Sequence, residues 1–459
     1  TFYQSVINLK AAGGRGEIVR KNEVALISDF LGNHLTATRH ANGRDWWILV
    51  SDMDTHRHYT FLLTPQGFSG PAVQDIGSYA LVGLGGVGWN GGSKFSATGK
   101  YFVHLLPETG FSLFEFDRCS GQLSKEHRVN YVNTPLRYAS GGSGLEFGDN
   151  DRYLYVNSSH IITESTHPAA IRSSVPFMIQ YDLQEPDWPM SGDTINVPPP
   201  GPYTFFNIVD EFLLGSATGP DGRIYVTYLG GSYCTVQYPD KKGKASVFKK
   251  DSPDFKNNIY RGIPYLPNYR LGPLDGSPCD TLGLNNVPVA NFRMDTPDST
   301  DLQTRYFYNL AHHEPATWRW DFGDGSPRST DTSALHTYAK PGKYRVCLTV
   351  SNRYGEDTYC REVYVGVTAA EEARAAAGTI EIVPNPADEG TAIYLPDAPA
   401  SNLPARLSVT DAVGRVVLSR PFSRQLAEVE VRSWPPGVYM VRVEQADGAV
   451  RTAKLVVAR

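Results

Sequence analysis

One short segment near the N-terminus brings together side-chain types that acid–base catalysis uses: His40, Arg44, Asp45 and Trp46. A histidine can take up or release a proton near neutral pH, and a carboxylate beside it can orient the ring. The alternative is structural, because the same groups can tie a turn to a strand through buried hydrogen bonds. We favour the structural interpretation.

A second polar run places acidic and imidazole side chains at alternate positions: Asp52, Asp54, His56 and His58. Residues at i and i+2 share one face of a strand, and such a face could hold a metal ion. We favour a solvated strand face or loop instead, because short polar runs that follow an apolar strand are usually exposed. His104 and His160 are further candidate bases, but no motif around them fixes a reaction.

Two glycine-rich runs lack the context that catalysis would need. Residues 83–88 contain no Lys followed by Ser or Thr and precede no helix, which argues against phosphate binding. Residues 141–145 lack the strand–turn–helix context of a nucleophilic serine. We expect no cofactor, no metal and no catalytic residue, with an enzymatic role left open only for the N-terminal region.

Residues 1–285, which must position these groups, repeat one pattern of turn, aromatic strand, turn and strand. Strands of similar composition start near positions 45, 100, 152 and 222, as in Trp46–Val50 and Tyr101–Leu105. Such a series is typical of β-propeller blades. No helical periodicity of useful length occurs, so the predicted fold class is all-β.

A compact unit follows at residues 286–367, and its sharpest motif is Trp320, Asp321, Phe322, Gly323, Asp324 and Gly325. Alternation turns Trp320 and Phe322 inward, and the two carboxylates can accept hydrogen bonds from a turn whose glycines allow positive φ. A carboxylate pair or calcium site is the alternative, but such carboxylates more often act as local caps. The whole unit resembles a PKD domain, which implies an immunoglobulin-like β-sandwich.

Residues 368–378 are rich in small and charged side chains and read as a linker or one loose helix. Residues 379–459 resemble the type A C-terminal sorting domain of the type IX secretion system. The resemblance implies a second immunoglobulin-like sandwich, recognition by the outer-membrane translocon and removal near the linker. It is carried, in order along the chain, by Pro384, Asn385, Pro386, Asp411, Gly414, Arg415, Gly437, Val438, Tyr439 and Lys454.

The first unit resembles a propeller region of large Bacteroidetes surface proteins. The matching residues lie at 21–22, 39–47, 95–101 and 116–121. The family pattern continues upstream of Thr1, and the chain lacks an initiator Met, so we expect an N-terminally truncated propeller and cannot judge export from this end. Blades of the WD type use His, Asp and Trp to tie a turn to a strand, which agrees with the structural interpretation of the His40 segment.

The bulk composition excludes several functional classes. With 43 basic and 48 acidic residues the net charge is −5, which gives no electrostatic case for nucleic acid. No run of 18 apolar residues could span a membrane. We expect a secreted or surface-bound binding or adhesion protein, with a glycan or protein ligand on the propeller. An extracellular hydrolase or lyase acting on glycan is the alternative.

The five cysteines are Cys119, Cys234, Cys279, Cys347 and Cys360, and none forms a CxxC pair. Counting back from a turn at Asn352–Gly355 sets Leu348 opposite Tyr359 and Cys347 opposite Cys360. Directly opposed cysteines in an antiparallel pair are close enough to bond, so this register predicts a disulfide. The pairing of the other three cysteines stays open, and an odd number leaves at least one outside a bridge.

Overall fold

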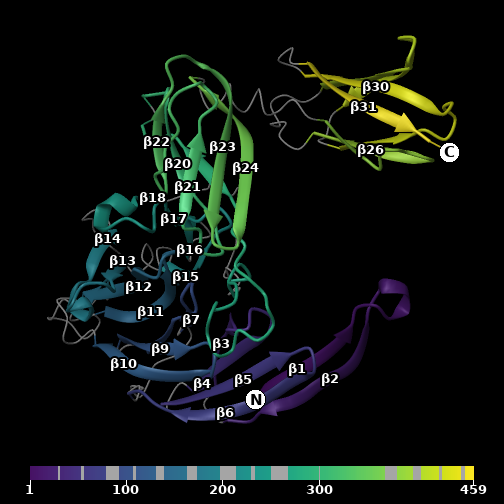
Figure 1. Ribbon diagram of the computed structural model, residues 1–459. Helices are drawn as coiled ribbons and strands as arrows, with labels where there is room; N and C mark the ends of the chain where they lie inside the picture. The colour runs from purple at the N-terminus through teal and green to yellow at the C-terminus, as the bar shows by residue number, and fades with distance from the viewer. Residues whose placement is uncertain are drawn as a thin grey trace.

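The structure is a computed structural model that describes residues 1–28, 31–52, 56–78, 92–106, 110–130, 139–162, 173–196, 213–228, 233–249, 267–298, 300–366, 380–395, 405–422, 426–445 and 450–458. The described residues are almost entirely β, as predicted, and their helical segments are single 3-10 turns (Figure 1). No helix among them is long and apolar enough to cross a bilayer.

Four consecutive four-stranded antiparallel sheets form the N-terminal region, each with its strands in chain order. The first strands of the sheets, β3, β7, β11 and β15, contact one another in sequence, which is the arrangement of propeller blades. Blade 1 contains β3 (Leu31–Arg39), β4 (Trp46–Asp52), β5 (Arg57–Thr64) and β6 (Gly67–Asp75). Blade 2 contains β7 (Ser93–Phe95), β8 (Tyr101–Leu106), β9 (Gly110–Asp117) and β10 (Gln122–Asn130).

The next two blades repeat this plan. Blade 3 contains β11 (Ala139–Phe147), β12 (Tyr153–Ile162), β13 (Ser173–Asp182) and β14 (Asp193–Asn196). Blade 4 contains β15 (Leu213–Thr218), β16 (Ile224–Tyr228), β17 (Tyr233–Val236) and β18 (Phe248–Lys249). Apolar and aromatic side chains fill the spaces between blades, and Phe111, Tyr181 and Trp188 belong to the core shared by blades 2 and 3. Blade 2, for example, contributes apolar side chains from one face to the core with blade 3 and from the other face to the core with blade 1, so both of its faces are buried.

A two-stranded hairpin of β1 (Phe2–Asn8) and β2 (Glu17–Leu26) precedes blade 1. It packs on that blade through Phe2, whose ring lies 5.5 Å from the ring of Phe61 and 6.2 Å from that of Phe68. Much of its remaining apolar surface is exposed.

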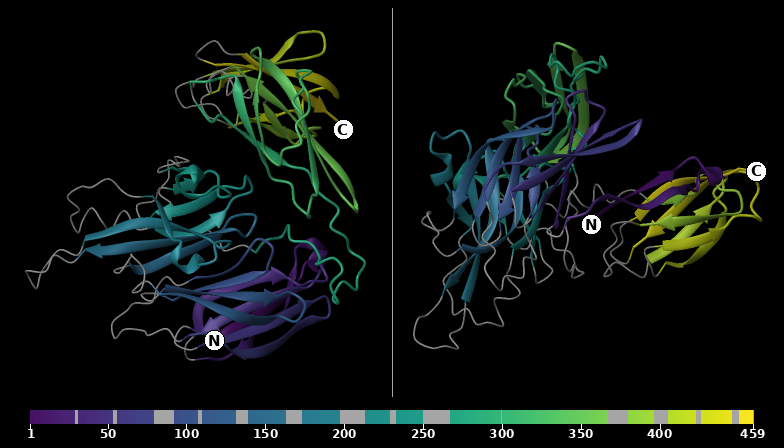
Figure 2. Two further views of the ribbon diagram at one scale, coloured as in Figure 1. Left: turned by 60° about the vertical axis from the view of Figure 1, so that its left-hand side comes forward. Right: turned by 90° about the horizontal axis from the view of Figure 1, so that it is seen from below.

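Residues 267–286 follow blade 4 and return across the turns of blades 1 and 2; we call this segment the strap. It has no strand of its own and forms a teal-green trace beside the purple strands in Figure 2. A backbone hydrogen bond from Leu274 N to Ala41 O (2.8 Å) ties it to blade 1. This Pro-rich segment lies between the propeller and the second unit in the sequence, and it makes specific contacts with the propeller.

The middle unit is a sandwich of two three-stranded sheets. One has the order β19 (Phe292–Asp295), β20 (Thr304–Asn309), β22 (Ala334–Thr337), and the other β21 (Thr317–Asp321), β23 (Gly342–Asn352), β24 (Gly355–Val365). Its core includes Trp320, Phe322 and Tyr338, all 3% exposed or less. Register in the β23–β24 hairpin sets Leu348 opposite Tyr359 and Cys347 opposite Cys360, and a disulfide joins the two cysteines. The turn count therefore predicted both the register and the bridge.

The last unit is also a sandwich. Its three-stranded sheet contains β25 (Glu381–Val383), β26 (Gly390–Tyr394) and β29 (Leu426–Glu430); the four-stranded sheet contains β28 (Val416–Phe422), β27 (Ala405–Thr410), β30 (Gly437–Glu444) and β31 (Val450–Val457). Tyr439, Val441 and Val443 of β30 point inward opposite Leu455, Ala453 and Arg451 of β31. Buried and exposed residues alternate along β30, so one face of the strand packs into the core.

Candidate functional site

The candidate cluster of the first blade lies in the turn between β3 and β4, at residues 40–45. Asn42 organises this turn: its Oδ1 accepts the backbone N–H groups of Arg44 and Asp45 at 3.0 Å each, and its Nδ2 donates to Asp45 Oδ2 at 2.7 Å. His40 N donates to Asp45 O at 2.8 Å and closes the turn. Most hydrogen bonds of this cluster therefore stay within its own turn, to the backbone or to Asp45.

Both ring nitrogens of His40 have partners. Asn42 N donates to Nδ1 (3.0 Å), so Nδ1 is the acceptor, and Nε2 can then donate its hydrogen to Cys119 O (3.2 Å). Asp45 is 6% exposed and bonds to the Arg44 guanidinium at 2.8 Å, which is the main reason why its pKa lies below the usual value. In this tautomer the lone pair of His40 Nδ1 already accepts the hydrogen bond from Asn42 N, so it is not available to a substrate proton.

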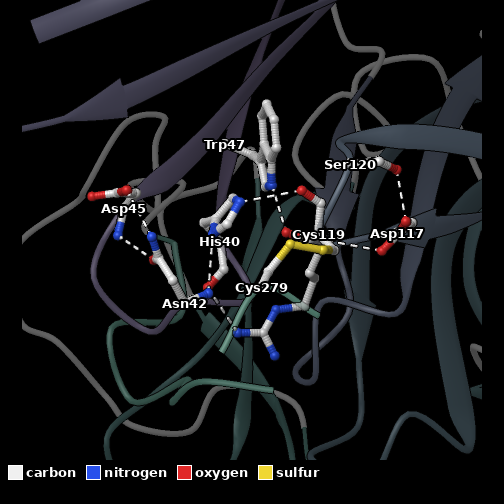
Figure 3. The surroundings of a disulfide bond; sticks show 9 residues. His40, Asn42, Asp45, Trp47, Asp117, Cys119, Ser120 and Cys279 are labelled. Atoms are coloured by element: carbon white, nitrogen blue, oxygen red, sulfur yellow. Dashed lines mark hydrogen bonds between the residues drawn. A yellow bond between two sulfur atoms is a disulfide. The ribbon is translucent and has the colours of Figure 1, made fainter. Parts of the chain in front are cut away.

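The two tryptophans of the segment face different neighbours. Trp47 is 9% exposed and donates its indole N–H to Arg118 O at 2.8 Å, as Figure 3 shows around the Cys119–Cys279 disulfide. Trp46 instead lies under the guanidinium of Arg39, at 4.7 Å, and beside Tyr269 of the strap, at 5.4 Å between rings. The structure thus brings His40, Arg44 and Asp45 together and places the Trp46 ring outside that network.

Arg118 is the centre of this region. It is 6% exposed, and burial lowers the pKa of its guanidinium to about 10. Its donors reach backbone carbonyls of Arg39 (2.9 Å) and Thr98 (3.3 Å), and Gly272 of the strap. One cation therefore links blade 1, blade 2 and the strap through carbonyl dipoles alone.

We expected the run from Asp52 to His58 to be solvated, but its first and last residues, Asp52 and His58, are buried. Asp52 ends β4 and is 2% exposed, accepting from Ser28 Oγ (2.8 Å) and Tyr59 Oη (3.1 Å). His58 lies on the next strand, so a hairpin connection separates residues that alternation assigned to one strand face. Asp54 lies outside the described residues. Among the described residues, no group of three or more His, Cys, Asp or Glu could hold a metal ion.

Blades 1 and 2 each bury a Ser–His pair at their interface. Ser51 Oγ lies 2.7 Å from His58 Nδ1, and Ser93 Oγ lies 2.8 Å from His104 Nδ1. The two imidazole rings meet edge to face at 5.7 Å. Burial lowers the pKa of His58 to about 4, so this ring is neutral at physiological pH. Both histidines therefore pack the interface between blades.

The remaining candidates of the propeller are the two glycine-rich runs and His160. Residues 141–145 lie within β11, so they form part of a strand and no nucleophile turn. The backbone of His160 lies in β12 opposite Ala139, and its side chain is outside the described set. Residues 83–88 also lie outside the described residues.

The carboxylates of the PKD-like motif cap their own loop. Asp321 Oδ1 accepts from Gly323 N (3.1 Å), and Asp324 Oδ1 accepts from Ser326 N (3.0 Å). Gly323 and Gly325 have φ values of 77° and 80°, which explains why glycine occupies both positions.

The structure adds one partner that the sequence did not indicate. His336 Nε2 lies 2.8 Å from Asp324 Oδ2, and its ring stacks on Phe322 at 3.9 Å. Burial opposes ionisation of Asp324, but hydrogen bonds from Ser326 and His336 outweigh it and lower the pKa to about 2.

In the last unit, the Pro384-Asn385-Pro386 motif covers the edge of β31. Asn385 Nδ2 donates to Lys454 O (2.8 Å) and its Oδ1 accepts from Val456 N (2.9 Å), so the side-chain amide replaces a peptide group of a neighbouring strand. Ala387 continues the pairing with Val456 O at 2.8 Å. The motif thereby protects an edge that would otherwise be open to other strands.

Two further motifs of this unit are turns. Asp411 Oδ1 accepts from Val413 N (3.1 Å) and Arg415 N (2.9 Å), and Gly414 has a φ of 85°. Tyr439 is 4% exposed and donates from its hydroxyl to Pro435 O at 2.7 Å; Gly437 and Val438 start the same strand. The Asp411 carboxylate and the Tyr439 hydroxyl thus bond to backbone groups close to them in the chain.

Sequence reasoning missed two long-range connections. One is the Cys119–Cys279 bridge, with Cα atoms 5.6 Å apart. Cys234 is buried in β17 and takes part in neither bridge.

The other feature is the junction of the propeller with the second unit. Arg293 of β19 stacks on Tyr308 at 3.9 Å, pairs with Asp295 at 2.9 Å, and donates to the backbone carbonyls of Asp221 and Gln237 in blade 4. The sequence signal for this junction was Arg293 and Asp295, two charged residues that alternate with the apolar residues Phe292 and Met294 in one strand.

Comparison with known proteins identifies two of the three units. Residues 285–367 match the PKD domain family, and residues 381–458 match the secretion system C-terminal sorting domain. The PKD1 domain of Vibrio anguillarum Epp is 32% identical, covers 18% of this chain and 98% of its own, and has a TM-score of 0.17. The PKD1 domain of the Vibrio cholerae metalloprotease PrtV is 27% identical over 18% of this chain and 99% of its own, with a TM-score of 0.16.

A third similar structure is PorZ of Porphyromonas gingivalis, a surface component of the type IX secretion system. It is 11% identical, covers 97% of this chain and 62% of its own, and has a TM-score of 0.26. The family matches, together with the β-sheet architecture, place the chain among modular proteins that carry a PKD domain and a type IX secretion sorting domain, which directs export through the periplasm to the cell surface or the medium.

Proposed function

We propose that the chain is a binding or adhesion protein whose propeller carries the ligand surface, while the PKD domain holds the propeller away from the membrane. The observation that carries this proposal is the junction between the two domains. A propeller that is fixed to its spacer presents one constant surface to the exterior, which suits recognition of an external ligand.

The junction is charged, and Arg293 and Asp295 within it are buried. Arg223 of blade 4 pairs with Asp221 at 2.6 Å and with Asp295 of the PKD domain, and Arg293 completes the cluster from the other side. Tyr308 of the PKD domain donates its hydroxyl to Asp240 at 3.0 Å. Interlocked ion pairs of this kind are costly to separate, because each would leave a buried charge without its partner.

The strap and the PKD domain cover the propeller end that carries the turns 40–45, 96–100 and 219–223; we call it the strap end. Asn268 Nδ2 donates to Ala97 O (2.7 Å) and Arg270 to Pro220 O (3.3 Å) at this end. We therefore place the ligand at the opposite end, where β4 terminates and β5 begins. Arg57 and Asp75, an exposed pair at 3.1 Å, mark that end in blade 1.

A blocking experiment tests both the binding role and its location. Full-length Arg57→Cys and Gln66→Cys proteins are each coupled to a polyethylene glycol maleimide and applied to an array of glycans and extracellular matrix proteins. Arg57 lies at the far end and Gln66 in the exposed β5–β6 turn at the strap end, whereas Cys234 is buried and shielded from the reagent. We expect coupling at residue 57 to abolish capture and coupling at residue 66 to leave it intact.

The enzymatic alternative predicts a different outcome. A glycan hydrolase or lyase would release shortened or unsaturated sugars from the arrayed glycans, and retained binding without product supports the binding role. If no arrayed ligand captures the protein and sugar products are released in solution, the binding role is wrong and the chain is a glycan-active enzyme. His40 and Asp45 form hydrogen bonds within their own turn, and this favours a binding role over an enzymatic one.

A further inference from the structure

The Cys119–Cys279 bridge joins positions that are far apart in both sequence and fold. Cys119 lies in the turn between β9 and β10 of blade 2, and Cys279 lies in the strap, 160 residues later. The enclosed chain contains blades 3 and 4, so the bond connects a late segment of the propeller to an early one. Both cysteines are only partly buried, and a small thiol can reach them.

The strap contacts three blades at one end of the propeller. It meets blade 1 through the Leu274–Ala41 hydrogen bond, blade 2 through Asn268 and the bridge, and blade 4 through Arg270. The ring of Tyr269 packs beside Trp46, but Leu274, Leu282 and Leu284 of the strap are exposed. The strap is therefore held by scattered hydrogen bonds and one covalent link rather than by a core of its own.

The strap also continues directly into the PKD domain. Asn286 Nδ2 donates to Pro273 O and to Asp275 Oδ2, both at 3.0 Å, and Asn352 of the PKD domain donates to Asn286 O at 2.6 Å. One end of the strap is thus fixed to the PKD sandwich, and the rest lies over turns of blades 1, 2 and 4. A release of the strap would free the blade 1 side while the PKD side stayed attached.

We propose that the strap and the Cys119–Cys279 bridge form a redox-dependent latch that closes the strap end of the propeller, holding blade 4 and the PKD domain to blades 1 and 2. In the oxidised protein the latch is shut. A dithiol opens it: the S–S bond breaks, the dithiol supplies two electrons and two protons to give two cysteine thiols, and the dithiol itself becomes a disulfide. The latch can therefore form only in an oxidising compartment, so closure follows transfer out of the cytoplasm.

Hydrogen exchange on the full chain, with and without the bridge, tests the latch. The Cys119→Ser/Cys279→Ser protein should lose protection in residues 267–280, in the 40–45 turn and around Cys119, and should keep it in β23 and β24. We expect the propeller transition in a thermal scan to fall by about 10 °C, because a crosslink across a loop this long removes much of the entropy of the unfolded chain.

The matched control opens the other bridge. Cys347→Ser/Cys360→Ser should lower the PKD transition and leave exchange in the strap unchanged. If the first variant fails to fold, the oxidised wild-type protein is titrated with dithiothreitol below its melting temperature, and the same segments should lose protection as Cys119 and Cys279 become alkylatable. Unchanged strap protection after both cysteines have been alkylated would overturn the proposal.

Discussion

The propeller and the PKD domain each contain one disulfide, but the two bonds join very different stretches of chain. Cys347 and Cys360 are 13 residues apart and opposite each other in one hairpin, with Cα atoms 4.1 Å apart. Cys119 and Cys279 are 160 residues apart and join blade 2 to the strap. In the chain-entropy account the short loop contributes about 3 kcal/mol and the long one about 5 kcal/mol.

The difference reflects what each domain already has. The PKD sandwich surrounds one apolar core in which Trp320, Leu348 and Val350 are fully buried, so its bridge reinforces a hairpin that is paired along its whole length. The propeller has several apolar cores, each between two neighbouring blades, and polar residues such as Arg118 add links at the strap end. A long-range crosslink therefore connects distant parts of the propeller, whereas the disulfide of the sandwich links two strands that are already paired.

The largest expected effect comes from the residue that couples the two regions. Arg293→Met removes the cation that pairs with Asp295 and donates to two carbonyls of blade 4, and breaking such a buried pair costs about 3–5 kcal/mol. Urea unfolding of the full chain should then show the propeller and PKD transitions moving apart. The matched control is Arg319→Met in the same domain, because Arg319 is half exposed and lies 3.9 Å from Glu356. Equal effects of the two variants would contradict a specific junction.

A smaller effect distinguishes the domains by pH, starting with the propeller. Burial lowers the pKa of His58 from 6.5 to about 4, so the folded state resists protonation more than the unfolded state does. The resulting stability is complete above pH 6.5 and is lost as pH falls toward 4, by about 3 kcal/mol. His58→Gln should remove this pH dependence from the propeller transition, and His127→Gln, at an exposed position of blade 2, should not. A pH profile that His58→Gln leaves unaltered would mean that another group controls it.

The corresponding group of the PKD domain acts in a lower pH range. Its Asp324 has a pKa lowered from 3.8 to about 2, so the stability it contributes is complete above pH 3.8 and is lost as pH falls toward 2. The expected contribution is about 1 kcal/mol, because solvent around this loop screens the interaction. Denaturant melts of Asp324→Asn at pH 5 should show the loss, and the difference from wild type should vanish near pH 2. Glu356→Gln, at an exposed position, serves as the control.

Features set by local geometry could be predicted from the sequence. The register at Cys347 follows from one turn, and the inward side of β30 follows from alternation at Tyr439 and Val441. The Asp321 and Asp324 caps follow from carboxylates placed next to glycines. Each of these depends on residues that are neighbours in the chain, so a short window contains the necessary information.

Features set by distant partners could not be predicted. Asp52 and His58 looked exposed because their burial comes from Ser28, Tyr59 and the adjacent blade. The Cys119–Cys279 bridge depends on the path of a strap that carries no strand pattern. The His40 segment had the composition of a catalytic site, and only its partners in the turn and in blade 2 show what its polar groups bind.

We expect the sorting domain to carry the propeller and the PKD domain to the cell exterior. The direct measurement compares the full chain with one that ends at residue 378, in cells with an active type IX system, using protease applied to intact cells and then to the periplasmic fraction. We predict that the full chain is accessible from outside, whereas the shortened chain stays in the periplasm, folded and with both disulfides formed. Equal surface exposure of the two proteins would contradict the account.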